Sequence, residues 1–269
     1  MRRNVAICIE YDGSSYFGWQ KQPDRRTVQG EIEAMLADFF DYEITVNGSG
    51  RTDTGVHALA QVANFNIDTA MPTANMKKAF NDALIYRNLR ESGGTFMAPV
   101  KIKWAKDVAD DFHARFSARG KKYIYRIKRK SSSSVFDRNY VYPVVHELDL
   151  DSMKRACVHL VGEHDFSAFM SAGAQPMDSY VREIFDMDVA CAADDEIRVS
   201  VTGSGFLYNM VRIITGTLVD IGRGKIRADK MRSILESQDR KNAGHTAPPQ
   251  GLYLAEVYYD WDSYDVADS

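Results

Sequence analysis

The sequence predicts an α+β protein built from two halves of ferredoxin-like, βαββαβ-type pattern. Segments with strand periodicity alternate with segments of helical periodicity, and the first half follows the order β-α-β-β-α-β of a split βαβ unit. The second half repeats this pattern less regularly. We therefore expect a large mixed or antiparallel sheet with helices, divided into a first half at 1–111, a second half at 112–262 and a frayed acidic tail at 263–269.

The first half begins with a strand at 4–12, where apolar residues occupy every second position. A helix follows at 27–40, with apolar residues at helical spacing and Thr27 as its predicted N-cap. A second helix is predicted from Thr73, its expected cap, to residue 84. The remaining predicted elements of this half are strands at 42–48, 60–67 and 99–108.

The second half carries the same two periodicities over longer segments. Its predicted strands are 121–129, 180–190, 196–203 and 251–260, and its predicted helices are 149–162, 206–222 and 228–238. A serine run at 131–134 and the segment 246–251 have the composition of loops.

Composition narrows the class of protein before any motif is considered. The chain has 269 residues, of which 45% are apolar, and a net charge of −3, so it can bury a core but shows no overall basic character. The cysteines are far apart in sequence (Cys8, Cys157 and Cys191), which argues against a zinc knuckle or a disulfide framework and favours a reducing, cytoplasmic setting. No apolar run reaches the length of a membrane helix, and the N-terminus does not resemble a signal peptide.

The segment GSGRTDTGVHA at 48–58 is the strongest candidate for an active site. It places Arg51 and Asp53 between Gly50 and Gly55. An arginine close to an aspartate favours the ionised carboxylate, and an ionised carboxylate in a cleft can act as a nucleophile. The glycines permit a sharp loop and a close approach of a large substrate. This pattern indicates one nucleophilic aspartate working without a metal or cofactor.

The alternative interpretation of this segment is an ordinary tight turn, since Asp and Gly are common in turns. We assign His57 no catalytic role, because a lone histidine beside a strand is typically packed or hydrogen-bonded. A glycosidase would need a second carboxylate beside Asp53, and nothing in the pattern brings Glu10 or Asp12 there.

A basic segment at 119–130 contains seven cations and no acid. Strand alternation sets Tyr123 and Tyr125 on one face and Lys122, Arg126 and Lys128 on the other. A solvated charged face is the simplest interpretation. Aromatic rings interleaved with cations are also what an RNA-binding surface needs, because rings stack on bases and cations contact phosphates.

Five segments together resemble the bacterial TruA-type tRNA pseudouridine synthases. They are EYDGSSYFGWQKQ at 10–22, GSGRTDTGVHA at 48–58, DFHARFSARGKKYIYRI at 111–127, FLYNMVRIITG at 206–216 and GLYLAEV at 251–257. The resemblance implies the pseudouridine synthase fold and the isomerisation of uridine to pseudouridine at positions 38–40 of the tRNA anticodon arm. It also implies a homodimer that needs neither metal nor cofactor.

Position by position, the resemblance makes Asp53 the catalytic aspartate and Arg51 the arginine that pairs with it and helps to displace the target base. Tyr123 matches the tyrosine that stacks on the target uracil, and Arg212 and Leu252 match further pocket positions. Thr54 stands where the family usually has alanine.

The chemistry and the resemblance agree, because this isomerisation adds and removes no atoms and therefore needs no cofactor. Whether Asp53 attacks C1′ of the ribose or C6 of the base, and whether Tyr123 accepts the C5 proton, stay open. The target base must leave its stack to be reached. An RNA-binding protein or RNA chaperone on the same scaffold, without activity, is the alternative function, against which the intact Arg51, Asp53 and Tyr123 argue.

Overall fold

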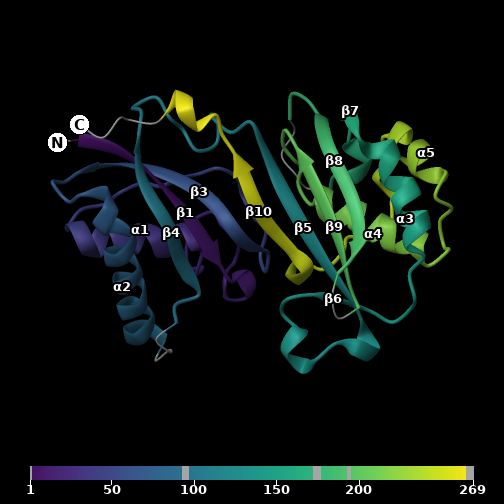
Figure 1. The fold of residues 1–269 in the computed structure, drawn as a ribbon, viewed down its shortest axis with the longest axis horizontal. Coiled ribbons are helices and arrows are strands. Elements are labelled where there is room, and N and C mark those ends of the chain that lie inside the picture. The colour runs from purple at the N-terminus through teal and green to yellow at the C-terminus, as the bar shows by residue number, and fades with distance from the viewer. Residues whose placement is uncertain (1, 93–96, 172–176, 193–194, 265–269) are drawn as a thin grey trace. The chain divides into compact units, whose positions relative to one another are not determined.

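The computed structural model describes residues 2–92, 97–171, 177–192 and 195–264. The chain folds into two compact units, one formed by residues 1–119 with 254–269 and the other by residues 120–253 (Figure 1). These units differ from the predicted halves in one respect: the greater part of the last predicted strand, from Leu254 onward, belongs to the first unit and not to the second. Of the tail predicted at 263–269, residues 265–269 lie outside the described part, while the amide of Ala109 donates to the carbonyl of Tyr264 at 3.0 Å.

The first unit has the element order predicted from sequence. Its elements are β1 (Arg2–Tyr11), α1 (Val28–Phe40), β2 (Asn47–Gly48), β3 (His57–Asp68), α2 (Thr73–Ser92) and β4 (Val100–Val108). The strands lie in the order β4-β1-β3-β10, with β2 paired to β3, and β1 is antiparallel to both β3 and β4. Figure 1 shows α1 and α2 beside this sheet. The mixed α+β class predicted from sequence is confirmed.

Local physics explains most of these boundaries, and two expectations need correction. Thr27 does cap α1, because its hydroxyl accepts the Gly30 amide at 3.3 Å. Thr73 is instead the first helical residue of α2, and its hydroxyl contacts Asp107. The strand predicted at 42–48 is reduced to Asn47 and Gly48.

Strand β1 is buried along both faces from Val5 to Ile9, because it is the inner strand between β3 and β4.

The second unit contains more helices and strands than the first. They are β5 (Gly120–Arg129), β6 (Tyr142–Val144), α3 (Leu150–Cys157), β7 (Gly162–Asp165), β8 (Val181–Cys191), β9 (Glu196–Gly203), α4 (Met210–Gly222) and α5 (Lys230–Ser237). The strands lie in the order β5-β9-β8-β7, and β6 runs parallel to β5. The short strands β6 and β7 were not predicted, since three or four residues show no clear periodicity.

The last strand, β10 (Leu252–Tyr258), contains the boundary between the two units: Leu252 and Tyr253 belong to the second unit and the residues from Leu254 onward to the first. Helix α4 of the second unit is almost entirely buried. Among the residues placed by the structure, no helix has the length and apolar character needed to cross a membrane.

Candidate active site

The loop between β2 and β3 carries Asp53 and is fastened to its surroundings mainly through its backbone. Its Thr52 carbonyl accepts the Trp19 amide at 3.0 Å, and the Thr52 hydroxyl forms a buried hydrogen bond of 2.7 Å with the hydroxyl of Tyr11. At the start of the loop, the amide of Ser49 donates to the carbonyl of Val62 at 2.8 Å. The loop is therefore held at both ends by the strand and by the segment that follows β1.

Two glycines of that segment explain why it can lie so close to the loop. A Cβ atom on Gly13 would fall 2.0 Å from the carbonyl oxygen of Val56. A Cβ atom on Gly18 would fall 2.6 Å from the carbonyl oxygen of Thr52, and Gly18 has φ of +83°. Only glycine fits both positions. The motifs at 10–22 and 48–58, which the sequence shows as separate, are thus the two sides of one backbone-to-backbone contact.

Asp53 is half-buried and begins a tight turn. Its carbonyl accepts the amide of Val56 at 3.1 Å, and Gly55 takes a left-handed φ of +79° within this turn. The tight-turn interpretation and the active-site interpretation are therefore compatible, because the turn fixes the backbone that bears the carboxylate.

Arg51 lies two residues before Asp53 in the same loop. Its side chain is exposed, and among the described residues no ion pair joins it to Asp53. The expectation that Arg51 holds the Asp53 carboxylate ionised by direct pairing is therefore not met in this structure.

His57 is a structural residue, as its pattern indicates. It is 2% exposed, and its Nδ1 atom accepts the amide of Gly13 at 3.1 Å. The same Nδ1 atom lies 3.3 Å from a carboxylate oxygen of Asp12. His57 therefore helps to hold the segment after β1 against the loop.

The other predicted pocket residues, Tyr123, Arg212 and Leu252, belong to the second unit. Tyr123 lies on β5 opposite Val201 of β9, is 8% exposed, and meets the ring of Phe206 edge-on with ring centroids 5.1 Å apart. An edge-to-face contact orients an aromatic ring. The burial of Tyr123 and Tyr125 confirms the strand alternation predicted for this segment.

Arg212 on α4 is oriented by the segment that leads into β10. Its Nε atom donates to the carbonyl of Ala247 at 2.8 Å, and the amide of Ala247 donates back to the carbonyl of Arg212 at 3.0 Å. A third bond, of 2.6 Å, joins the Arg212 guanidinium to the side-chain oxygen of Asn209. Leu252, which begins β10, is buried.

Tyr125 of β5 contacts the same segment before β10 that orients Arg212. The sequence did not indicate this contact. Its hydroxyl donates to the carbonyl of Pro248 at 2.5 Å, and a Cβ atom on Gly251 would lie 2.6 Å from its ring. Burial raises the pKa of Tyr125 well above its ordinary value, so its hydroxyl stays protonated and available as a donor. Asn209 was also missed, although its place three residues before Arg212 on a predicted helix was a usable signal.

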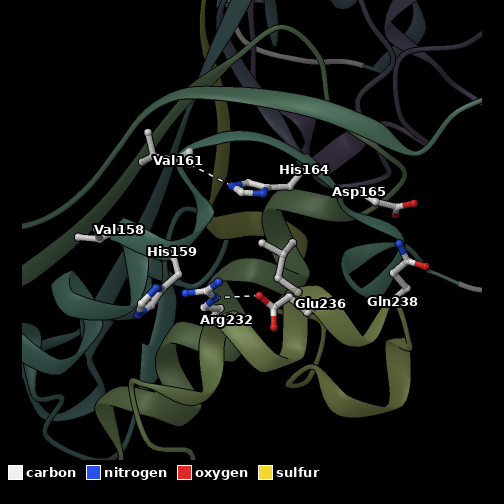
Figure 2. A pocket seen from close by; sticks show the side chains of 9 residues that line it. Val158, His159, Val161, His164, Asp165, Arg232, Glu236 and Gln238 are labelled. Atoms are coloured by element: carbon white, nitrogen blue, oxygen red, sulfur yellow. Dashed lines mark hydrogen bonds and ion pairs between the residues drawn. The ribbon is translucent and has the colours of Figure 1, made fainter.

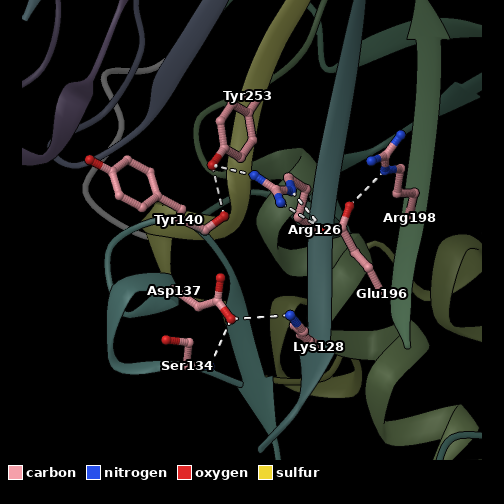
Figure 3. Close-up of polar contacts among 8 residues, drawn as sticks. All are labelled: Arg126, Lys128, Ser134, Asp137, Tyr140, Glu196, Arg198 and Tyr253. Carbon is pink, nitrogen blue, oxygen red and sulfur yellow. Dashed lines mark hydrogen bonds and ion pairs between the residues drawn. The ribbon is translucent and has the colours of Figure 1, made fainter. Parts of the chain in front are cut away.

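The basic face of β5 is much less open than its sequence suggests. Arg126 forms an ion pair of 2.6 Å with Glu196 of β9 and a hydrogen bond of 3.3 Å with the hydroxyl of Tyr253 (Figure 3). Arg198 donates to the same Glu196 at 2.6 Å. The bond to Glu196 raises the pKa of Arg126. Burial acts to raise the pKa of Glu196, but its bonds to Arg126 and Arg198 outweigh burial and hold that pKa below its usual value.

Two more cations of the segment also have acidic partners. Lys128 contacts Asp137 at 3.2 Å (Figure 3). Arg129 contacts Glu147 at 3.0 Å. Of the three residues predicted to contact RNA phosphates, Arg126 and Lys128 are thus engaged inside the protein. Lys122, opposite Thr202, is half-buried and has no ion pair among the described residues.

A cavity of about 630 Å³ opens elsewhere in the second unit, beside α5 and β7 (Figure 2). Residues of three types line it: the apolar Val158, Val161 and Leu235, the basic His159, His164 and Arg232, and the acidic or amide Asp165, Glu236 and Gln238. None of the predicted site residues is among them. Within the described part of the chain, no group of three or more His, Cys, Asp or Glu side chains could hold a metal ion.

Comparison with known proteins gives a consistent result. A family profile described as tRNA pseudouridine synthase matches residues 7–117 and 156–260. Proteins named tRNA pseudouridine synthase A from Acetivibrio thermocellus and Caldicellulosiruptor saccharolyticus are 46% and 44% identical over 257 residues, which is 96% of this chain and 100% of each relative. A crystal structure of a Cbf5-Nop10-Gar1 complex matches 93% of this chain and 57% of its own chain, at 10% identity and a TM-score of 0.37.

Proposed function

Because the chain belongs to the tRNA pseudouridine synthase family, we propose that it isomerises uridine to pseudouridine at positions 38, 39 and 40 of the tRNA anticodon arm. Family membership makes it an RNA pseudouridine synthase, and the position on tRNA is our proposal. The observation that carries the proposal is the Asp53 loop, in which a half-buried carboxylate stands on a turn locked by backbone contacts. Such fixation is what a nucleophile needs, because the reacting atom must be held in place.

We propose Asp53 as the nucleophile. The reaction breaks the bond between N1 and C1′, turns the uracil, and forms a bond between C5 and C1′. A proton leaves C5 and a proton is gained at N1, so atoms and charge balance without a co-reactant. Attack of the carboxylate on C1′ or on C6 fits this balance equally well, and both routes require Asp53 to be ionised.

The remaining site residues have supporting roles in this proposal. Tyr123 stacks on the target uracil, with its ring angle set by Phe206. Arg212 and Leu252 shape the pocket, and the bonds of Arg212 to Ala247 and Asn209 support a fixed guanidinium. Arg51, exposed and without an ion pair to Asp53, is suited to reaching the RNA and helping to displace the target base.

The proposal extends to the partner and the setting. Lys122 is the one residue of the predicted basic face that we retain as a phosphate contact, since Arg126 and Lys128 are held by carboxylates. We propose that the protein acts as a homodimer in the cytoplasm, on the anticodon arm of tRNA.

The test is an incubation of unmodified tRNA transcripts with the protein and no cofactor, followed by mapping of pseudouridine at single-nucleotide resolution. We expect conversion at positions 38, 39 and 40 and nowhere else. Matched transcripts with cytidine at each of these positions, with stem pairing restored, should lose only the corresponding signal. Binding of tRNA without any conversion would instead support an RNA-binding protein without activity.

A further inference from the structure

The connection between β5 and β6 presents two apolar side chains to solvent at its tip. Val135 is 73% exposed and Phe136 is 78% exposed. They lie in a short 3₁₀ turn, Val135–Asp137, which follows the serine run. We call residues 130–138 the apex loop. Single exposed apolar residues are ordinary, but an adjacent pair with an aromatic ring on a structured turn calls for an explanation.

The apex loop is ordered by a dense set of local hydrogen bonds. Ser134 and Asp137 form a reciprocal capping box: the Ser134 amide donates to the Asp137 carboxylate at 2.8 Å, and the Ser134 hydroxyl accepts the Phe136 amide at 3.2 Å. Arg138 closes the turn by donating to the carbonyl of Val135 at 2.9 Å. Figure 3 shows Asp137 lying between Ser134 and Lys128. The exposed ring of Phe136 is thus carried on a fixed backbone.

Lys128 therefore has a different function from the one its sequence position suggests. Its ammonium group contacts Asp137 at 3.2 Å, and the hydrogen bond from Ser134 together with the Lys128 charge keeps the pKa of Asp137 below its ordinary value. This contact joins the strand to the turn and compensates the single acid of the apex loop. Lys130 and Arg138 are exposed cations of the same loop, and Arg138 donates to the carbonyl of Val135. The tip is locally cationic in a chain whose net charge is −3.

We propose that the apex loop is an RNA contact, in which Phe136 stacks on an unpaired base and Lys130 and Arg138 meet the neighbouring phosphates. The proposal rests on the proposed function, because it names a contact with the RNA substrate. An exposed aromatic ring and exposed cations in one loop are the combination that binds single-stranded segments, since every base offers a flat face and every nucleotide a negative charge. A ring carried on an ordered backbone loses less conformational freedom on binding than one on a flexible loop.

A second copy of the chain fits this surface less well. Two cationic tips would repel each other across a symmetric interface. The apolar area of one phenylalanine and one valine is also far below the roughly 1,200–2,000 Å² that stable protein interfaces bury. Charge complementarity therefore favours RNA.

The first experiment measures tRNA affinity of the full-length protein for an unmodified tRNA transcript. Phe136→Ala should weaken binding roughly 5- to 150-fold, because stacking on a base contributes about 1–3 kcal/mol. Phe136→Trp should retain the parent's affinity, since tryptophan also stacks. Val145→Ala is the control: Val145 is 69% exposed in the same unit but lies outside the apex loop, and its removal should leave the affinity unchanged.

The second experiment detects the stacking directly by tryptophan fluorescence. Addition of tRNA to the Phe136→Trp protein should quench more emission than in the parent or in a Val145→Trp protein, because a stacked base quenches an indole. Parent-like affinity of Phe136→Ala together with no additional quenching would overturn the proposal. A change of sedimentation in Phe136→Ala with tRNA affinity intact would overturn it in favour of a contact between copies.

The same measurements separate this proposal from the proposed function. If the parent binds tRNA but forms no pseudouridine, the proposed function fails, while a weakened Phe136→Ala variant still supports the RNA contact. If the parent forms pseudouridine and Phe136→Ala matches it in both affinity and rate at low tRNA concentration, the RNA contact fails and the proposed function stands.

Discussion

The Asp53 loop of the first unit and the strand β5 of the second are the two segments that stand out in the sequence for their charged residues. The loop is fixed by contacts between backbone groups, such as the bond from Trp19 to Thr52 and the close approach of Gly18. The charges of β5 are matched by side chains that arrive from elsewhere, with Glu196 on Arg126 and Asp137 on Lys128.

This difference teaches how far each kind of pattern can be trusted. A glycine at a point where two backbones touch can be recognised in the sequence, because no other residue type fits there. A run of cations does not show which acids will pack against it, and so its charge says little about what it binds. The predictions below test this contrast, and they are ordered by decreasing size of the expected effect.

The largest effect is expected for Asp53→Asn, which removes the charge from the loop and leaves its shape. Asparagine is nearly isosteric but cannot act as the nucleophile, so pseudouridine formation should fall by a factor on the order of 10³ or more. Affinity for tRNA should stay near that of the parent. The rate is measured in single turnover with saturating enzyme, and a rate close to the parent's would remove Asp53 as the nucleophile.

The backbone contact of the loop is tested by Gly18→Ala with Gly224→Ala as its control. Both glycines have left-handed φ, +83° and +73°, but a Cβ atom on Gly224 would meet nothing within 4 Å. The control should cost about 1 kcal/mol of unfolding free energy, from backbone strain alone. Gly18→Ala should cost about 3 kcal/mol and should slow turnover on the order of 10²-fold by displacing Thr52. Equal losses in both variants would show that the close approach is unimportant.

Tyr123, on the buried face of β5, is the residue of this strand for which we propose a direct role at the uridine. If it only stacks, Tyr123→Phe should act like the parent and Tyr123→Leu should lose roughly 5- to 150-fold in kcat/KM, from about 1–3 kcal/mol of stacking. If its hydroxyl accepts the C5 proton, Tyr123→Phe should be as poor as Tyr123→Leu. Normal activity of both variants would contradict a role for Tyr123 at the uridine.

The charged face of β5 is tested by Glu196→Gln, with Glu147→Gln as its control. The Glu196 side chain is 8% exposed, and its loss leaves the partly buried Arg126 without its carboxylate, so we expect a cost of about 1–3 kcal/mol. The Glu147 side chain is 80% exposed, and its loss should change stability by at most about 0.5 kcal/mol. Denaturant unfolding measures both, and equal small effects would show that the Arg126 pair contributes little.

The pH dependence of the same pair follows from the lowered pKa of Glu196. Because the folded protein binds this proton less readily than the unfolded chain, the pair stabilises fully above the ordinary pKa of 4.5. That contribution is lost as the pH falls below 4.5 through the lowered value. The stabilities of the parent and Glu196→Gln should therefore converge in acid, and a difference that stays constant to pH 2 would count against the assignment.

The smallest effect is expected for Lys122→Gln, and it falls on the salt dependence of tRNA binding. Each lost phosphate contact should lower the slope of log affinity against log salt by roughly 0.7–0.9, without changing turnover at saturating tRNA. Arg126→Gln is the control from the same face: its slope should match the parent's and its stability should fall, because Arg126 is bound to Glu196. Unchanged slopes in both variants would leave β5 without a role in phosphate binding.

Much of the fold could be predicted because its signals are local. The order of elements in the first unit follows from two periodicities, and the cap at Thr27 follows from one hydroxyl at a helix start. Strands β6 and β7 could not be predicted because they are too short to show a periodicity. Other differences arise because tertiary packing overrides the local pattern. Residues 42–46 have apolar alternation, yet the structure extends no strand through them.

The α+β class, the Asp53 loop between its glycines and the family to which the chain belongs could all be inferred from the amino-acid sequence. Each of these depends on residue types at fixed spacing along the chain, which any reader of the sequence can see. Only the tertiary structure decided that Arg51 does not pair with Asp53, that Arg126 and Lys128 are held by carboxylates, and that Phe136 is exposed on a fixed turn. The physical reason is that charge pairing and exposure depend on groups distant in sequence, whose positions are fixed only when the elements pack together.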